Sequence, residues 1–256
     1  MPTVRIIGPG RAGRSLAAAL AGVGSWDVLP LLGRHDDVAG AASGCDLLVV
    51  AVPDASVATV AATVAPVPAT VVAHLAGSLT LDALAPHTRR ASLHPLTALA
   101  DPVRGVRRLT GGAWFAVAGD PLVRDVAVAL GGRIVEIPDN PKARAIYHAA
   151  ACAAANHLVA LMGSVERMAA AVGVPLDAYL DLAWGALDDV AAVGPAAALT
   201  GPVARRDHAT VARHRAAIPS GELATYDALT SAAETLRGAD TRIGDGQGHR
   251  GRTPCN

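Results

Sequence analysis

A glycine-rich turn near the start of the chain most constrains what it can fold into. Gly8-Pro9-Gly10-Arg11-Ala12-Gly13 has the pattern GxGxxG, follows the apolar run 4–7 and opens the helical stretch 14–21. In a strand-turn-helix unit the first glycine permits the tight turn, the second lets the backbone approach a pyrophosphate and the third lets the helix pack on the strand. The phosphates then lie at the helix N-terminus. An ordinary glycine turn has the same letters, but this position between strand and helix predicts a dinucleotide site.

The first half of the chain alternates short apolar runs with alanine-rich stretches, which is typical of repeated βα units. The apolar runs are continuous, as in strands that are buried on both faces. This pattern predicts an α/β fold, a Rossmann domain with a doubly wound, mostly parallel sheet. The expected strands are 4–7, 27–32, 47–52, 70–75, 91–94, 114–118 and 134–137.

The pattern changes after Ile137, where a turn-rich segment leads into helical sequence. Asn140 is the expected N-cap and Pro141 the first residue of a helix that runs uninterrupted to Gly173. Further helices are expected at 175–190, 202–217 and 222–237. We therefore predict a Rossmann domain at 1–138, an all-α substrate and dimerisation domain at 139–237 and a disordered tail at 238–256.

The composition excludes several classes of partner. Hydrophobic residues make up 52% of the chain and the formal net charge is zero, so no summed field attracts nucleic acid or an anionic membrane. We expect no secretion signal and no membrane span, because polar residues and glycines interrupt the apolar stretches, and hence a cytoplasmic protein. Cys45, Cys152 and Cys255 are widely spaced and predict reduced thiols. No metal site is expected.

The end of the second predicted strand distinguishes the two nicotinamide cofactors. NAD sites usually place an acid there for the ribose 2′-hydroxyl, whereas NADP requires a cation for the 2′-phosphate. Arg34 follows this strand, and Arg11 in the glycine turn can close over the same phosphate, so we expect NADP. Asp36 or Asp37 as an NAD-type acid remains the alternative. At the end of the third strand the expected cofactor contacts are Val52, Pro53 and Asp54.

Polar side chains that suit hydride transfer follow two strands and occupy the long helix. Ser78 and His94 come at strand ends, on the edge of the sheet where ligands of open α/β folds bind. His148, Cys152 and Asn156 are spaced i, i+4 and i+8 and therefore share one helical stripe. Reduction of a carbonyl or imine needs a proton donor and a group that polarises the acceptor, tasks that suit His148 and Asn156. The alternative is that this pair hydrogen-bonds across the domain junction.

Several of these segments together resemble a known group of proteins. They are the glycine turn, Ala76-Gly77-Ser78, the segment 92–96, the helix from Tyr147-His148 to Asn156-His157 and the turn 199–202. Over residues 1 to about 237 the chain resembles Rossmann-like proteins with a C-terminal domain of unknown function. That family is distantly similar to ketopantoate reductase, pyrroline-5-carboxylate reductase and deazaflavin-dependent NADP reductases.

The resemblance implies roles for further residues. Ketopantoate reductase carries a catalytic lysine eight residues before an asparagine, and His148 holds the place of that lysine here. Residues 200–205 resemble the segment with which ketopantoate reductase binds its substrate. Thr200 and Arg205 are therefore expected to bind substrate, and the guanidinium of Arg205 can bind a substrate carboxylate. Lys142, the only lysine in the chain, is a further substrate-binding candidate, although it lies about 21 Å along the helix from Asn156.

Taken together, the residues predict an NADP-dependent oxidoreductase that transfers a hydride from NADPH to a small keto or imino acid. Two alternatives stay open, namely a non-catalytic NADP-binding sensor or partner protein, and a reductase of oxidised deazaflavin. A homodimer built on the alanine-rich helical domain is expected.

Overall fold

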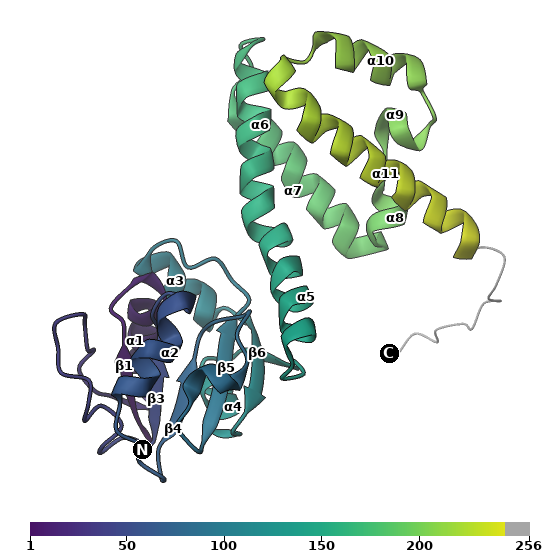
Figure 1. The fold of residues 1–256 in the computed structure, drawn as a ribbon. Helices are drawn as coiled ribbons and strands as arrows, with labels where there is room; N and C mark the ends of the chain where they lie inside the picture. Colours follow the sequence, from purple (N-terminus) through teal and green to yellow (C-terminus); the bar gives the residue numbers. More distant parts are fainter. Residues whose placement is uncertain (244–256) are drawn as a thin grey trace, which may run out of the picture. The chain divides into compact units, whose positions relative to one another are not determined.

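The computed structural model describes residues 1–243 and divides into two compact units, the first ending at Ala155 and the second beginning at Asn156. The first unit holds a seven-stranded sheet of order β2-β1-β3-β4-β5-β6-β7, parallel except for the antiparallel pair β5 and β6 (Figure 1). The strands are β1 (Thr3–Ile7), β2 (Asp27–Val28), β3 (Leu47–Val50), β4 (Val71–His74), β5 (Arg90–Pro95), β6 (Trp114–Gly119) and β7 (Arg133–Glu136). The predicted α/β fold with a mostly parallel sheet is confirmed.

The central strands are buried on both faces because each face has its own helical cover. Leu47 and Val49 of β3 enter a core with residues of three helices, whereas Leu48 and Val50 enter a second core on the other face. The first core is covered by α1 (Arg11–Val23), α3 (Pro102–Thr110) and α4 (Leu122–Ala129). The second is covered by α2 (Asp54–Thr63) and the 3-10 helix η1 (Leu81–Leu84). This double cover explains why the strand sequences are continuously apolar.

The second strand is shorter than the predicted range 27–32. It pairs with β1 only at Asp27–Val28, and a single bridge then joins Leu32 to Ile7. Pro30 lies between the two and has no N–H to donate to a ladder, so regular pairing stops there. The segment after Pro30 nevertheless runs beside β1 as far as the glycine turn, where the N–H of Gly8 donates to the carbonyl of Leu32.

The long helix begins as predicted but is not uniform. Asn140 caps α5 (Pro141–Cys152) by accepting a hydrogen bond from the N–H of Ala143 at 2.9 Å. A π-helical turn (Ala153–His157) separates α5 from α6 (Leu158–Ala170), instead of an uninterrupted α-helix to Gly173. A π-turn contains an additional residue, so the α-helical spacing that would align His148 with Asn156 does not continue through it.

The first unit also extends beyond the predicted domain boundary at residue 138. The start of α5 packs on the sheet through Arg144, whose side chain is fully buried and donates a hydrogen bond to Ser92 of β5. Turn-forming residues at 138–141 therefore mark the start of a helix but do not end the compact unit.

The second unit is helical, as predicted. Its helices are α6, α7 (Leu176–Val193), α8 (Pro195–Ala198), α9 (Gly201–Ala204), α10 (His208–Ala217) and α11 (Leu223–Ile243). Glu222, just before α11, accepts hydrogen bonds from Ser164 and Arg167 of α6, which tie the two helices together. The Arg167 and Ser164 hydrogen bonds lower the pKa of Glu222 to about 2.

Two predictions about the second unit need correction. The predicted helix 202–217 is interrupted, because Arg206 has a φ of 59° and Asp207 then caps α10 by accepting from the N–H of Thr210. The predicted tail began at Gly238, but α11 continues through this residue to Ile243. The rest of that tail, 244–256, lies outside the described residues.

Within the described residues, Pro141–Ala170 is long and apolar enough to cross a membrane by length and composition alone. The sequence predicted no such segment. None of the apolar window of this segment is buried in the structure, although Arg144 near the start of the segment is buried against the sheet.

We expect the variant Phe115→Ala to lower the free energy of unfolding of the first unit by about 3 to 5 kcal/mol, because Phe115 of β6 is fully buried and its loss leaves a cavity. Urea denaturation followed by circular dichroism measures the change. The matched control Val128→Ala removes a side chain of α4 that is 65% exposed, and it should change stability by less than about 0.5 kcal/mol. Equal losses in both variants would contradict the burial.

Candidate functional site

The glycine turn after β1 has the geometry that its sequence predicts. Gly8 has a φ of 108°, and a Cβ atom there would lie 2.3 Å from the carbonyl oxygen of Ala51. A Cβ atom at Gly13 would lie 2.1 Å from the carbonyl oxygen of Gly8. Both positions therefore exclude any side chain, and the turn is held tightly against β3 and α1.

The N-terminus of α1 faces open space. Gly10 is the N-cap, no side chain caps the helix, and its first turn contains no acidic residue. A Cβ atom at Gly10 would meet nothing within 4 Å, and Pro9 and Arg11 beside it are exposed. The helix start at Arg11-Ala12-Gly13 therefore offers backbone N–H groups to an anion, and a dinucleotide pyrophosphate fits this turn.

The loop after β2 places a cation near the glycine turn and uses its acids internally. Asp36 accepts a hydrogen bond from the N–H of Gly33 at 2.6 Å, and Asp37 accepts one from the N–H of Ala39 at 2.9 Å. Arg34 is exposed and forms no ion pair within residues 1–243. The guanidinium is thus available to a phosphate, while both alternative acids stabilise the loop.

The segment that follows β3 contacts the glycine turn and carries Asp54, which forms a hydrogen bond with Ser78. Val52 lies against the turn, with Cγ1 3.2 Å from the place of a Cβ atom on Gly8, and Pro53 is the N-cap of α2. Asp54, the first residue of α2, accepts a hydrogen bond from the hydroxyl of Ser78 at 2.8 Å. The structure therefore brings together Asp54 and Ser78, which the sequence had assigned to cofactor and to catalysis respectively.

His94, near the carboxyl end of β5, is the centre of an aromatic cluster with two residues of α5. Its Nδ1 shares a hydrogen bond of 2.5 Å with the hydroxyl of Tyr147, and the two rings are nearly perpendicular. The ring of His148 lies edge-on to His94, with 5.9 Å between centroids. Cys152, one turn further along α5, has its sulfur 3.9 Å from Nε2 of His148.

The cluster depends on a glycine at the end of β4. A Cβ atom at Gly77 would lie 2.8 Å from Cδ2 of His148 and 3.0 Å from Cε1 of His94. Only a residue without a side chain lets both imidazoles approach this backbone. Gly77 therefore joins the end of β4 to the same site as Ser78.

Burial sets the protonation states of the pair. It lowers the pKa of His94 to about 4, and the neighbouring His148 adds to the shift. Burial also raises the pKa of Tyr147 to about 12. At neutral pH the imidazole of His94 is therefore uncharged and the phenol of Tyr147 keeps its proton.

A buried cation lies beneath the cluster. Arg144 is fully buried, donates from Nη2 to the hydroxyl of Ser92 at 2.7 Å and pairs with Asp139 at 3.3 Å. Its Nε and Nη1 have no hydrogen-bond partner among the described residues. His74 of β4, in register with Ser92, is also fully buried, and burial followed by the charge of Arg144 lowers its pKa to about 4.

Sequence reasoning identified His94, His148 and Ser78 but missed Arg144 and Tyr147. The signal was present, because residues three and four apart share a helix face and Arg144 precedes Tyr147 and His148 by these spacings. Lys142 is exposed and forms no ion pair within residues 1–243. The remaining predicted residues, Asn156, Thr200 and Arg205, belong to the second unit.

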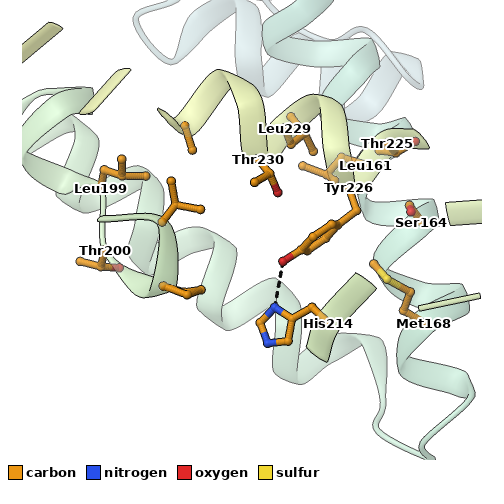
Figure 2. A pocket seen from close by; sticks show the side chains of 13 residues that line it. Leu161, Ser164, Met168, Leu199, Thr200, His214, Thr225, Tyr226, Leu229 and Thr230 are labelled. Carbon is orange, nitrogen blue, oxygen red and sulfur yellow. Dashed lines mark hydrogen bonds between the residues drawn. The ribbon is translucent and has the colours of Figure 1, made fainter. Parts of the chain in front are cut away.

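The second unit has a pocket of its own, which Figure 2 shows. Its volume is about 340 Å³, and its walls are mainly apolar. Thr200 lines it, whereas Arg205 does not, so these two predicted substrate residues are not brought together there. The hydroxyl of Tyr226 shares a hydrogen bond of 2.8 Å with Nδ1 of His214 at this pocket.

Comparison with known proteins supports the fold. Residues 115–233 match a family model described as a domain of unknown function, DUF2520. A search of curated proteins gave no match. The match agrees with the expected resemblance to Rossmann-like proteins that carry a C-terminal domain of unknown function.

Solved structures match the fold over most of the chain. A candidate NADP oxidoreductase from Bacteroides fragilis is 17% identical with a TM-score of 0.74, covering 91% of this chain and 98% of its own. Protein TM1727 from Thermotoga maritima is 23% identical with a TM-score of 0.69, covering 93% and 99%. Plasmodium falciparum pyrroline carboxylate reductase, solved with NADP bound, is 14% identical with a TM-score of 0.61, covering 92% and 98%. The fold is therefore that of Rossmann-like oxidoreductases with a helical C-terminal domain.

The buried His74 should make the folded state sensitive to acid. Because its pKa is about 4 when folded and 6.5 ordinarily, the unfolded chain binds this proton more readily. Stability should therefore fall as the pH falls from 6.5 toward 4, by about 3 kcal/mol from this group. Urea denaturation at both ends of this range measures the loss. His74→Leu should remove the share of His74 and leave that of His94, whose pKa burial also lowers to about 4.

The control for this prediction is His35→Asn, which replaces an exposed histidine of the same unit and should leave the acid sensitivity of the parent protein unchanged. An equal loss of stability in His74→Leu and in the parent protein would show that other groups cause it.

Proposed function

We propose that the protein is an NADP-dependent oxidoreductase that reduces a small keto or imino acid. The observation that carries this proposal is the meeting of two features at one edge of the sheet. The anion-binding turn follows β1, while Ser78 and the cluster of His94, Tyr147 and His148 lie at the ends of β4 and β5. Carboxyl ends of parallel strands form the ligand-binding edge of open α/β folds, so cofactor and reacting groups would share it.

The choice of NADP rests on the loop after β2. Arg34 is available to a 2′-phosphate, and Asp36 and Asp37, which would suit NAD, accept hydrogen bonds within the loop. The structurally similar pyrroline carboxylate reductase was solved with NADP, and a similar reductive aminase from Aspergillus terreus with NADPH. Bound NADPH would supply the hydride.

The substrate proposal rests on the cluster. The protonated phenol of Tyr147 and the predicted donor His148 both lie within it, so a proton source is present for a reduced carbonyl or imine. Ketopantoate is one candidate, by the resemblance described above. The predicted roles of Asn156, Lys142, Thr200 and Arg205 remain part of this proposal.

The variant Arg34→Ala should weaken NADPH binding by about 10-fold to 100-fold, because a charge-assisted hydrogen bond contributes about 1.5 to 3 kcal/mol. Binding of NADH, which lacks the 2′-phosphate, should stay unchanged. Fluorescence titration measures both. The control Arg133→Ala changes a cation of β7, at the opposite edge of the sheet from β2, and should leave both affinities intact.

Equal weakening of NADPH and NADH by Arg34→Ala would overturn the assigned role of this arginine. Tight NADPH binding without oxidation by any keto acid, imino acid or oxidised deazaflavin would favour a non-catalytic sensor. Oxidation only with deazaflavin would identify the carrier as the substrate.

We also propose a homodimer that uses the helical unit. No residue of α7 is buried, and Trp184 and Leu187, three residues apart on one face of the helix, are 66% and 44% exposed. Such an apolar helix surface is typical of a protein-protein interface. The supporting sequence feature is the alanine-rich composition of these helices.

The variant Trp184→Asp should convert this dimer to a monomer, because a buried unpaired carboxylate opposes association. Sedimentation equilibrium gives the mass directly. The control Val128→Asp introduces the same charge at an exposed position of α4 and should remain dimeric. A monomeric parent protein, or a dimeric Trp184→Asp variant, would contradict this interface.

A further inference from the structure

Resting on the proposed function, we propose that the group reduced is a neutral carbonyl, and that Tyr147, paired with His94, protonates its oxygen. The proposal assigns the proton step to Tyr147 instead of His148 and selects the keto class over protonated imines. Its basis is the geometry of one hydrogen bond and the charges around it.

The Tyr147–His94 pair can release a proton to a third atom. When His94 carries its proton on Nδ1, it donates to the phenol oxygen over the observed 2.5 Å, and the phenol O–H is then directed elsewhere. His94 stands at the carboxyl end of β5, and Tyr147 is only partly buried. A substrate at this edge of the sheet can therefore accept the phenol proton. His148 contacts Cys152 and the edge of His94, without a comparable oxygen or nitrogen partner among the described contacts.

The charges near the Tyr147–His94 pair favour a substrate oxygen that gains negative charge during the reaction. Arg144 is a buried cation whose Nε and Nη1 make no hydrogen bond, and its charge opposes protonation of His74 and of His94. Two carboxylates, those of Asp54 and Asp139, favour protonation of His74 instead. Asp139 pairs with Arg144 and also accepts from the N–H of Leu81, while Asp54 accepts from Ser78.

The full set of groups acting on His94 includes His148, Asp54, Arg144 and His74, and their sum with burial leaves it uncharged at neutral pH. The pair is therefore a neutral proton donor above a buried cation. This arrangement stabilises an oxygen that gains negative charge, because preorganised donors and charges act strongly where water is excluded.

For a carbonyl substrate, bound NADPH would supply a hydride, which is the electron pair of the new C–H bond. The π electrons of C=O would then move to the oxygen. The oxygen takes the proton of Tyr147, and the phenolate that remains accepts a hydrogen bond from Nδ1–H of His94. Nδ1–H passes to the phenolate only as Nε2 of His94 takes a proton from solvent, so the imidazole stays neutral and changes its tautomer. An iminium cation already carries its proton and yields a neutral amine, so it needs no donor and would be repelled by Arg144.

The test is the variant Tyr147→Phe, assayed by NADPH oxidation with two probe classes. These are small α-keto acids, including ketopantoate, and the cyclic imine 1-pyrroline-5-carboxylate. We expect oxidation with a keto acid, a loss of about 100-fold to 10,000-fold in kcat in the variant, and unchanged NADPH affinity. The matched control Tyr179→Phe removes the hydroxyl of a half-buried tyrosine of α7 that lies outside this cluster and should keep full activity.

A readout without cofactor checks the pair itself. Alkaline titration of tyrosinate absorbance should show a tyrosine that ionises near pH 12 in the parent protein and in Tyr179→Phe and that is absent in Tyr147→Phe. The ring resonances of His94 should shift in Tyr147→Phe alone.

The outcomes separate the two proposals. Oxidation by the imine and not by any keto acid, or full activity of Tyr147→Phe, would overturn the present inference and leave an NADP-dependent reductase. NADPH binding without oxidation by either class would instead remove the proposed reduction of keto and imino acids.

Discussion

The buried guanidinium of Arg144 is the interaction on which the site depends. A cation without access to water is costly unless it is paired, and here one nitrogen serves Ser92 and Asp139 while Nε and Nη1 have no partner within the described residues. Removal of one partner from such a pair typically costs about 3 to 5 kcal/mol. The arginine therefore fixes α5 on the sheet and holds a positive charge, paired with Asp139, close to the aromatic cluster.

The architecture of the sheet brings the remaining parts to this point. His74 and Ser92 lie in register on neighbouring parallel strands, and His94 follows Ser92 on the same face of β5. Their face receives α5, whereas the opposite face is filled by the core with α1, α3 and α4. The glycine turn and the aromatic cluster thus lie at the same edge of the sheet. The polar side chains of His74, Ser92 and His94 all lie on one face of it.

The sequence predicted the strands and the glycine turn because these depend on local patterns, namely continuous apolar runs and a turn that excludes side chains. It did not predict the burial of Arg144, since one arginine among many carries no local mark of its packing. The boundary at residue 138 was inferred from turn chemistry, which reports where a helix starts, whereas the division after Ala155 follows from how α5 packs. The π-turn lies in a run of alanines that gives no signal for it.

The spacing within α5 also restricts how the chain can change in length. Arg144 anchors the helix, and Tyr147 and His148 follow three and four residues later on the same face. One inserted or deleted residue between them would rotate the two rings by about 100° away from His94 while leaving the anchor in place. Natural variation in this segment should therefore be confined to exchange of residues, whereas loops such as the one after β2 can gain or lose residues without moving the cluster.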